Sequence, residues 1–423
     1  MKIPRRQSRK VTMTLLVGIV IWTIGTMLNT LKICVLNDRQ EPFSHAKIRE
    51  REERHIRCNQ GEKHNIVFIK CMKCATETMA TILRRFGYTR KLNFVLPVKK
   101  NLYLGWPYLM EDGDYRVTKK EFNILMEHSI FTPSLMSKLM PNNTVYISII
   151  RDPWENFKSV FSYFGLGRIA DVPEGQGQII DYLRNILKYE EIYTSPEKNQ
   201  LRLCIPDNFS MTRNLMSHCL GMPLGFPASR DNITGNMSAV NEYIMMLDSQ
   251  FLHILIADYF VESLVLLKRL MCWSFKDILY HQSNVASYPF KYLVPKGDYY
   301  DIHRNWSHVD YLLFDHFNKT FWNKVAKEGP DFGEEVQVFR LTQMLVERFC
   351  FVEQNWNSPS VYLTIPRSRF NEAFNVSEED CRLLNVYLLP SLWQQYFEQE
   401  GLTPENLPPV EQRPKPHKGC SIN

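Results

Sequence analysis

Three residues around one expected helix start could bind an anion. Lys73 stands three residues before Thr76, and Thr78 falls in the expected first helical turn. Backbone N–H groups at a helix N-terminus favour negative charge, and a lysine and two hydroxyls add further donors. A Walker A loop needs GxxxxGK followed by Ser or Thr, but no glycine occurs from residue 65 to residue 86. The segment therefore predicts an oxyanion site that differs from the P-loop of an ordinary nucleoside triphosphatase.

A second cation, Arg151, predicts another anion site. It directly follows an apolar run, and Asp152 and Pro153 beside it suit the cap and the first position of a helix. The planar guanidinium of arginine can bind two phosphate oxygens at once. If both segments end neighbouring strands of one sheet, the pair suits a ligand with two separated anionic groups.

Apolar patterning indicates the elements that would position these residues. Short buried strands are predicted at residues 65–69, 122–126, 145–150 and 253–257. Helical spacing of apolar residues occurs from 76 to 87, where we expect Gly87 to end the helix, and from 261 to 273. This alternation predicts an α/β fold with a P-loop-like parallel sheet and helices on both faces. Ligands of such sheets bind where strands end and helices begin.

The position of the basic residues predicts a membrane anchor. The net charge is +6, but residues 1–10 hold five basic and no acidic side chains, so the rest of the chain is close to neutral and no nucleic-acid partner is expected. Residues 11–31 carry no charge and are long enough to span a bilayer, with the basic flank in the cytosol. We expect a cytosolic tail (1–10), a signal-anchor helix (11–31), a luminal stem (32–64), a main luminal domain (65–400) and a C-terminal tail (401–423).

Sequons and cysteines agree with a luminal location. Seven Asn-x-Ser/Thr sequons could accept glycans. They begin at Asn142, Asn208, Asn232, Asn236, Asn305, Asn318 and Asn375. Some of the ten cysteines are expected to pair in an oxidising lumen, although their connectivity does not follow from the sequence.

Two short motifs leave other functions open. Asp112-Gly113-Asp114 is a DxD that could hold a metal ion and a nucleotide sugar, as in a type II Golgi glycosyltransferase, although Asp-Gly is also a common turn. Cys71 and Cys74 form a CxxC between a strand and a helix, which is the place of a thiol oxidoreductase motif.

Eight short segments are informative when they are taken together: residues 65–70 (NIVFIK), 86–87, 151–153, 161–165, 213–215, 262–268, 272–273 and 318–322. In these segments the chain resembles the galactose 3-O-sulfotransferases, a family of Golgi carbohydrate sulfotransferases that includes the enzyme acting on galactosylceramide. The resemblance extends over most of the expected luminal part.

The resemblance implies that residues 65–400 form a sulfotransferase catalytic domain in a single-pass Golgi membrane protein. Its co-substrate would be 3'-phosphoadenosine 5'-phosphosulfate, and its acceptor the 3-hydroxyl of a terminal β-galactose on a glycolipid or glycan. The implied donor-binding residues are Lys70, Lys73, Cys74, Ala75, Thr76, Thr78, Arg151, Ser159 and Arg213. His128 would be the catalytic base and Lys73 the catalytic cation at the leaving group. No metal ion is expected, because lysine and arginine supply the charge.

The donor loop departs from the family pattern. The family typically has Lys-Thr-His-Lys-Thr where this chain has Lys70-Cys71-Met72-Lys73-Cys74. Glu77 stands where a small residue is usual, and a carboxylate beside a phosphosulfate is unfavourable unless it turns outward. These departures leave open a catalytically weakened luminal binding protein of the same fold.

Overall fold

The structure is a computed structural model that describes residues 58–59, 61–98, 102–175, 177–202, 205–281, 287–352 and 361–409. The expected cytosolic tail and signal anchor, and most of the expected stem, lie outside these residues. In the part of the chain that the structure describes, no helix combines the length and the hydropathy that a membrane crossing requires.

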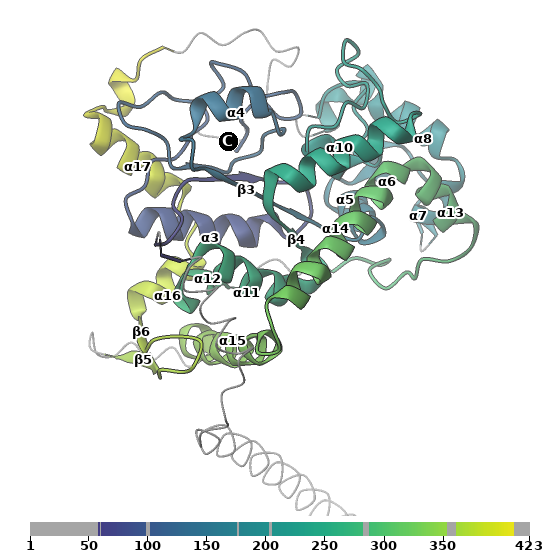
Figure 1. Ribbon diagram of the computed structural model, residues 1–423. Coiled ribbons are helices and arrows are strands. Elements are labelled where there is room, and N and C mark those ends of the chain that lie inside the picture. Colours follow the sequence, from purple (N-terminus) through teal and green to yellow (C-terminus); the bar gives the residue numbers. More distant parts are fainter. Residues whose placement is uncertain are drawn as a thin grey trace, which may run out of the picture. The chain divides into compact units, whose positions relative to one another are not determined.

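A four-stranded parallel sheet lies at the centre of the domain, as predicted (Figure 1). Its order is β2-β1-β3-β4, with bounds β1 (Ile66–Ile69), β2 (Ile124–Leu125), β3 (Val145–Ile150) and β4 (Phe251–Ile256). Ile66 pairs with Ile124 on one side and with Val145 on the other. The strand predicted at 122–126 is shorter than expected, because only two of its residues pair with β1.

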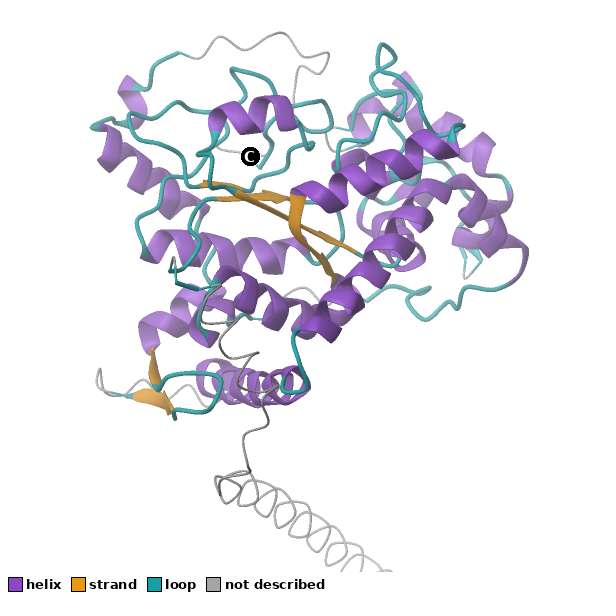
Figure 2. Ribbon diagram, viewed as in Figure 1, coloured by secondary structure: helices purple, strands orange, loops and turns teal. Residues whose placement is uncertain are grey.

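Helices cover both faces of this sheet, which confirms the predicted α/β layers (Figure 2). In the view of Figure 1, α3 (Thr76–Thr89), α11 (Phe260–Met271) and α12 (Phe275–Ile278) lie below the sheet, and α4 (Pro133–Leu139) and α10 (Met237–Gln250) lie above it. The other helices are α5 (Pro153–Tyr163), α6 (Leu166–Ile169), α7 (Gln178–Arg184), α8 (Ile186–Thr194), α9 (Leu215–Cys219), α13 (Gly297–Trp306), α14 (His308–Lys327), α15 (Phe332–Glu347), α16 (Glu378–Asn385) and α17 (Leu389–Glu400). The remaining elements are η1 (Pro196–Leu201), η2 (Ala257–Tyr259), η3 (Arg348–Val352), η4 (Pro404–Asn406) and the antiparallel pair β5 (Tyr362–Ile365) and β6 (Phe374–Ser377).

Gly87 does not end α3, so the predicted helix stop is wrong. The helix continues to Thr89. A Cβ atom on residue 87 would overlap the ring of Phe94 and would lie 2.8 Å from the Cδ1 atom of Ile124. The glycine therefore lets the Phe94 segment pack closely against the helix, and its role is packing.

Both ends of the described chain are fixed to the domain. Cys58 is disulfide-bonded to Cys272 at the end of α11, and Trp273 donates a hydrogen bond to the Lys63 carbonyl (3.2 Å). A second disulfide joins Cys350 to Cys381. Beyond α17, Leu402 and Leu407 pack against the core. The folded domain thus includes the end of the expected stem and the start of the expected tail.

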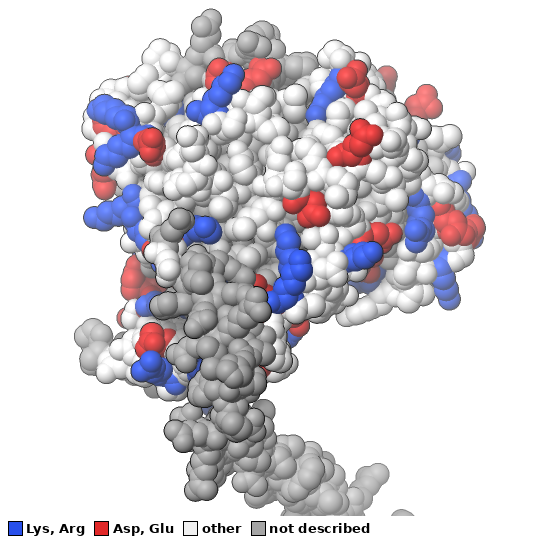
Figure 3. All heavy atoms as spheres, in the orientation of Figure 1, with Lys and Arg blue, Asp and Glu red and all other residues white. Residues whose placement is uncertain are grey.

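The described surface carries charges of both signs. On the face shown in Figure 3, acidic and basic side chains are interspersed and form no broad basic patch. All sequon asparagines except Asn318 are exposed. Asn318 is half-buried in α14, and its side-chain oxygen is fully buried. Asn318 is therefore the sequon least suited to carry a glycan.

Candidate donor and transfer site

The two predicted anion sites lie at the same edge of the sheet. β1 and β3 are adjacent and parallel, so the loop after Ile69 and the turn at Arg151 follow neighbouring carboxyl ends. The Asp152 carboxylate accepts a hydrogen bond from the Glu155 amide (3.0 Å), and Pro153 is the first residue of α5. The predicted cap is confirmed, and it fixes the start of α5 next to Arg151.

The backbone of the donor loop, residues 70–75, turns sharply without a glycine. Lys73 and Ala75 have left-handed backbone angles, with φ of 59° and 58°. Such angles are uncommon outside glycine and occur often at functional sites. Ala75 precedes the first residue of α3, and no side chain caps this helix end. The backbone N–H groups of the first turn of α3 are thus suited to bind an anion.

Asn156, which the sequence analysis missed, holds this loop in place. Its side-chain amide, in the first turn of α5, donates to the Met72 carbonyl (2.8 Å) and to the Cys74 sulfur (3.2 Å). Both contacts are buried. The loop is therefore fastened to α5, the helix that follows Arg151. The only sequence signal was a polar residue one turn after the predicted cap.

Lys70 belongs to an ion cluster in which Arg84 and Glu127 are buried and Glu77 is partly exposed. Its ammonium lies 2.8 Å from a Glu77 oxygen and 3.7 Å from a Glu127 oxygen, and the side chain is 1% exposed. Arg84 contacts the same two carboxylates at 2.6 and 2.9 Å. Two cations and two carboxylates give a cluster that is neutral overall. The charge of Lys70 is therefore already balanced within the protein.

The same ion cluster explains how a carboxylate, Glu77, can stand near the donor loop. Burial alone would raise the pKa of its carboxyl, but the charges and hydrogen bonds of Lys70 and Arg84 outweigh burial and lower this pKa to about 2. Glu77 is therefore ionised at neutral pH and faces its two cations. The expected conflict with a bound anion is reduced, because the carboxylate is neutralised where it stands.

Lys73 has a different environment. Its ammonium lies over the ring of Tyr163, 3.7 Å from the ring centre. Burial lowers the pKa of Lys73, and the nearby charge of Arg151 lowers it further. Among the residues that the structure describes, no carboxylate forms an ion pair with Lys73, whereas Arg151 lies 3.6 Å from Glu155. Lys73 and Arg151 thus lie close enough for the charge of Arg151 to disfavour the charged form of Lys73.

His128 is oriented by the carbonyl of Lys70. Its Nδ1 atom lies 3.1 Å from that oxygen. A carbonyl oxygen only accepts hydrogen bonds, so Nδ1 carries the proton and Nε2 keeps its lone pair in the neutral ring. Burial lowers the pKa of His128 well below its usual value, and the charge of Lys70 adds to this effect. The imidazole is therefore neutral at physiological pH, and its Nε2 atom makes no hydrogen bond to another described residue.

An extended segment supports this histidine. Its backbone amide and carbonyl bond to Leu102 and Leu104, both at 2.8 Å. The Tyr103 ring stacks on the imidazole with ring centres 5.6 Å apart. Tyr103 was also absent from the sequence-based set of site residues, because only the sheet-like pairing of two distant segments places it there.

The remaining predicted residues are distributed unevenly. Thr76 and Thr78 lie in the first turn of α3 as expected, whereas the Cys74 side chain is fully buried, so Cys74 could contact a donor only through its backbone. Ser159 lies two turns into α5, is 7% exposed, and its hydroxyl makes no hydrogen bond to another described residue. Arg213 is exposed and lies 4.6 Å from the Trp306 ring centre, and no described contact joins it to Lys73 or Arg151.

The two alternative motifs gain no support from the structure. Cys71 and Cys74 are free, fully buried thiols, and burial raises the pKa of both well above the usual value. A reactive thiol needs the opposite, a lowered pKa and access to solvent. In the DxD motif, the Asp112 carboxylate accepts from Tyr115 and the Asp114 carboxylate accepts from the Glu111 amide, so both are used within one turn.

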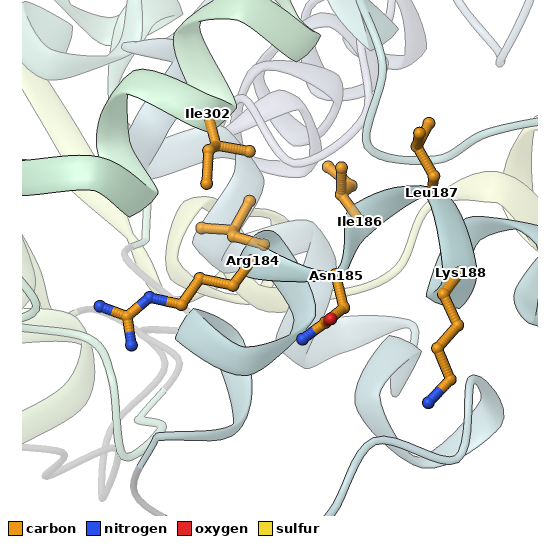
Figure 4. A pocket seen from close by; sticks show the side chains of 7 residues that line it. Arg184, Asn185, Ile186, Leu187, Lys188 and Ile302 are labelled. Atoms are coloured by element: carbon orange, nitrogen blue, oxygen red, sulfur yellow. The ribbon is translucent and has the colours of Figure 1, made fainter.

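The described residues contain no group of three or more His, Cys, Asp or Glu side chains with the arrangement of a metal site. A surface hollow with a volume of about 240 Å³ lies where α7 meets α8. Figure 4 shows the side chains that line it. Its lining is Leu183, Arg184, Asn185, Ile186, Leu187, Lys188 and Ile302, and it includes none of the predicted site residues.

Comparison with known proteins defines the class. The family model described as galactose-3-O-sulfotransferase matches residues 1–364. The chain therefore belongs to the galactose-3-O-sulfotransferase family, which confirms the resemblance seen in the sequence.

Individual relatives are similar at a moderate level. Galactosylceramide sulfotransferase from Homo sapiens is 30% identical over 296 residues, which cover 68% of this chain and 64% of the relative. Galactose-3-O-sulfotransferase 2 from Sus scrofa is 29% identical over 299 residues, covering 68% of each chain. Galactose-3-O-sulfotransferase 3 from Mus musculus is 28% identical over 294 residues, covering 68% and 64%. The matched region thus spans about two thirds of the second relative and slightly less than two thirds of the first and the third. No solved structure matches this chain.

Proposed function

We propose that this protein transfers the sulfuryl group of 3'-phosphoadenosine 5'-phosphosulfate to the 3-hydroxyl of a terminal β-galactose on a glycolipid or glycan. Family membership supports the reaction class. The observation that carries the proposal is the hydrogen bond from His128 Nδ1 to the Lys70 carbonyl, because it leaves Nε2 as a neutral base beside the donor loop.

The reaction needs few groups from the protein. The sugar hydroxyl attacks sulfur, and the new bond forms as the bond from sulfur to the 5'-phosphate oxygen breaks. His128 Nε2 takes the hydroxyl proton. Lys73 and the first turn of α3 stabilise the negative charge that develops on the departing oxygen. Arg151 and Ser159 hold the 3'-phosphate, and the nucleotide leaves as 3'-phosphoadenosine 5'-phosphate.

Lys70 takes a supporting role in this proposal. Its ammonium is paired with Glu77 and its carbonyl orients His128, so it acts on the donor through the shape of the loop. Cys74 and Ala75 contribute backbone N–H groups. For Arg213, only the resemblance to the family supports a contact with the nucleotide.

We place the reaction in the Golgi lumen, with the chain anchored once through residues 11–31 in type II orientation. The Cys58–Cys272 and Cys350–Cys381 disulfides fit an oxidising compartment, and the exposed sequons fit passage through the secretory pathway. An anchored enzyme of this kind meets glycolipid acceptors at the membrane surface.

Transfer of radiolabelled sulfate tests the proposal. The full-length protein in detergent micelles is given labelled donor and, side by side, galactosylceramide, lactose and N-acetyllactosamine. We expect label on at least one β-galactoside and no loss of transfer when a chelator is added. Loss of activity with the chelator would count against the proposal.

A second function is favoured by Met72, which replaces the usual loop histidine and is buried at 7% exposure. A catalytically weakened binding protein would be stabilised against heat by 3'-phosphoadenosine 5'-phosphate without transferring sulfate to any acceptor. The same preparation distinguishes the two functions, because binding with turnover identifies the enzyme and binding without turnover identifies the binding protein.

A further inference from the structure

Lys73 forms no ion pair with a described carboxylate, and its ammonium contacts the ring of Tyr163 instead. The ammonium lies 3.7 Å from the centre of the Tyr163 ring. Attraction between a cation and an aromatic face is electrostatic, and it leaves the charge of the cation in place. A carboxylate partner would instead cancel that charge, as Glu77 does for Lys70. The ring can therefore hold the ammonium without reducing its attraction for an anion.

The ring stands on a rigid support. Tyr163 is the last residue of α5, whose first turn is capped by Asp152 and tied to the donor loop by Asn156. The buried Phe164 ring packs edge-on against Tyr163, with ring centres 4.9 Å apart. Both ends of α5 thus touch the donor loop, one through Asn156 and the other through Tyr163.

The Tyr163 side chain lies at the surface. It is 63% exposed, so its ring is accessible beside the Lys73 ammonium. It also lies near enough to Tyr103, which stacks on His128, to contribute to the raised pKa of Tyr103 after burial. Tyr163 therefore contacts Lys73 and lies in the neighbourhood of the aromatic ring that stacks on the proposed base.

We propose that Tyr163 is the positioning residue of Lys73, and that its ring keeps the ammonium directed at the phosphosulfate of the donor. This inference rests on the proposed function, because it assumes that Lys73 contacts the donor. The left-handed backbone at Lys73 sets where its side chain begins, and contact with the Tyr163 ring sets where the ammonium lies.

Nucleotide binding by full-length variants tests the role of Tyr163. The affinity for 3'-phosphoadenosine 5'-phosphate is measured by calorimetry for the parent protein and for Tyr163→Ala and Tyr163→Phe. We expect Tyr163→Ala to weaken binding about 2- to 5-fold, the range of a cation–π contact at an exposed site. Tyr163→Phe keeps the ring face and should retain the parent affinity. Unchanged or tighter binding in Tyr163→Ala would overturn the proposal.

A double-mutant cycle separates positioning from general damage. Once Lys73→Met has removed the ammonium, adding Tyr163→Ala should have no further effect on affinity, because the ring then has nothing to hold. Additive losses would show that Tyr163 acts by another route. Tyr362→Ala, an exposed tyrosine in β5, is the matched control and should bind like the parent.

The same data distinguish failure of the proposed function from failure of the role proposed for Tyr163. If the parent protein fails to bind the nucleotide, the proposed function fails. If the parent binds and Lys73→Met weakens binding while Tyr163→Ala does not, the donor site stands and only the role of Tyr163 is rejected.

Discussion

Two lysines three residues apart in one loop have opposite environments. Lys70 is buried and balanced by Glu77 and Glu127, whereas Lys73 rests on an aromatic ring and is repelled by Arg151. The charge of Lys70 is balanced within the protein, whereas the charge of Lys73 is available to a bound anion. The comparison teaches that a basic loop residue is a binding candidate only after its partners within the protein are known.

The two ends of the loop should therefore have different functions. The end at Lys70 should set stability and the orientation of His128, and the end at Lys73 should set ligand binding and transfer. Each half can be broken separately, so the contrast can be tested one substitution at a time.

The largest effect is expected from His128→Ala. Removing a general base costs about 100- to 10,000-fold in rate, so sulfate transfer should fall by that factor while affinity for 3'-phosphoadenosine 5'-phosphate stays unchanged. Because the pKa of His128 is lowered, the parent should keep its turnover as the pH falls through 6.5, the usual histidine value. Substantial transfer by His128→Ala would remove this residue as the base.

Arg84→Leu should break the Lys70 half. It leaves Glu127 buried with only Lys70 at 3.7 Å, and breaking a buried ion pair costs about 3 to 5 kcal/mol. Urea unfolding followed by tryptophan fluorescence measures the loss. Arg382→Ala, which breaks an exposed pair with Glu379, is the control and should cost no more than about 1 kcal/mol. Equal losses in the two variants would contradict the assigned structural role of the cluster.

Lys73→Met should break the other half. Losing a cation that stabilises the leaving group costs about 100- to 1,000-fold in turnover, whereas stability should fall by no more than about 1 kcal/mol, because only the contact with the Tyr163 ring is lost. Transfer rate and unfolding are measured on one preparation. A large drop in stability with intact transfer would reverse the contrast between the two lysines.

Glu77→Gln should give the smallest effect and sharpen the comparison by pH. A carboxyl whose pKa is lowered stabilises the folded state above its unfolded pKa of about 4.5, and this contribution is lost as the pH falls toward 2. The parent should therefore be more stable than the variant at neutral pH, and the two stability curves should converge between pH 4.5 and 2. Parallel curves over that range would show that the Glu77 charge does not stabilise the fold.

Local signals predicted most of the fold. The strand at 145–150 has the predicted bounds, and the cap at Asp152 and the helix start at Thr76 are confirmed. Gly87 was misassigned because a helix-ending glycine and a packing glycine look alike in a sequence. Only contact with Phe94, across the fold, distinguishes the two roles.

The site was less predictable, because its key contacts join distant segments. Arg84 lies two helical turns after Glu77, so that ion pair had a sequence signal, but Glu127 is 43 residues from Arg84. The proton position on His128 depends on a carbonyl 58 residues away. Asn156 and Tyr163 reach the donor loop from another helix and were absent from the predicted set.

Apolar period, caps and motifs are local properties of the chain, so the strands, the donor loop, the helix starts and the family could be predicted from the residues alone. Which lysine keeps its charge available, and which nitrogen of His128 is basic, became visible only in the folded molecule. Those properties depend on distances and burial between residues far apart in the sequence, and electrostatic energies change steeply with both.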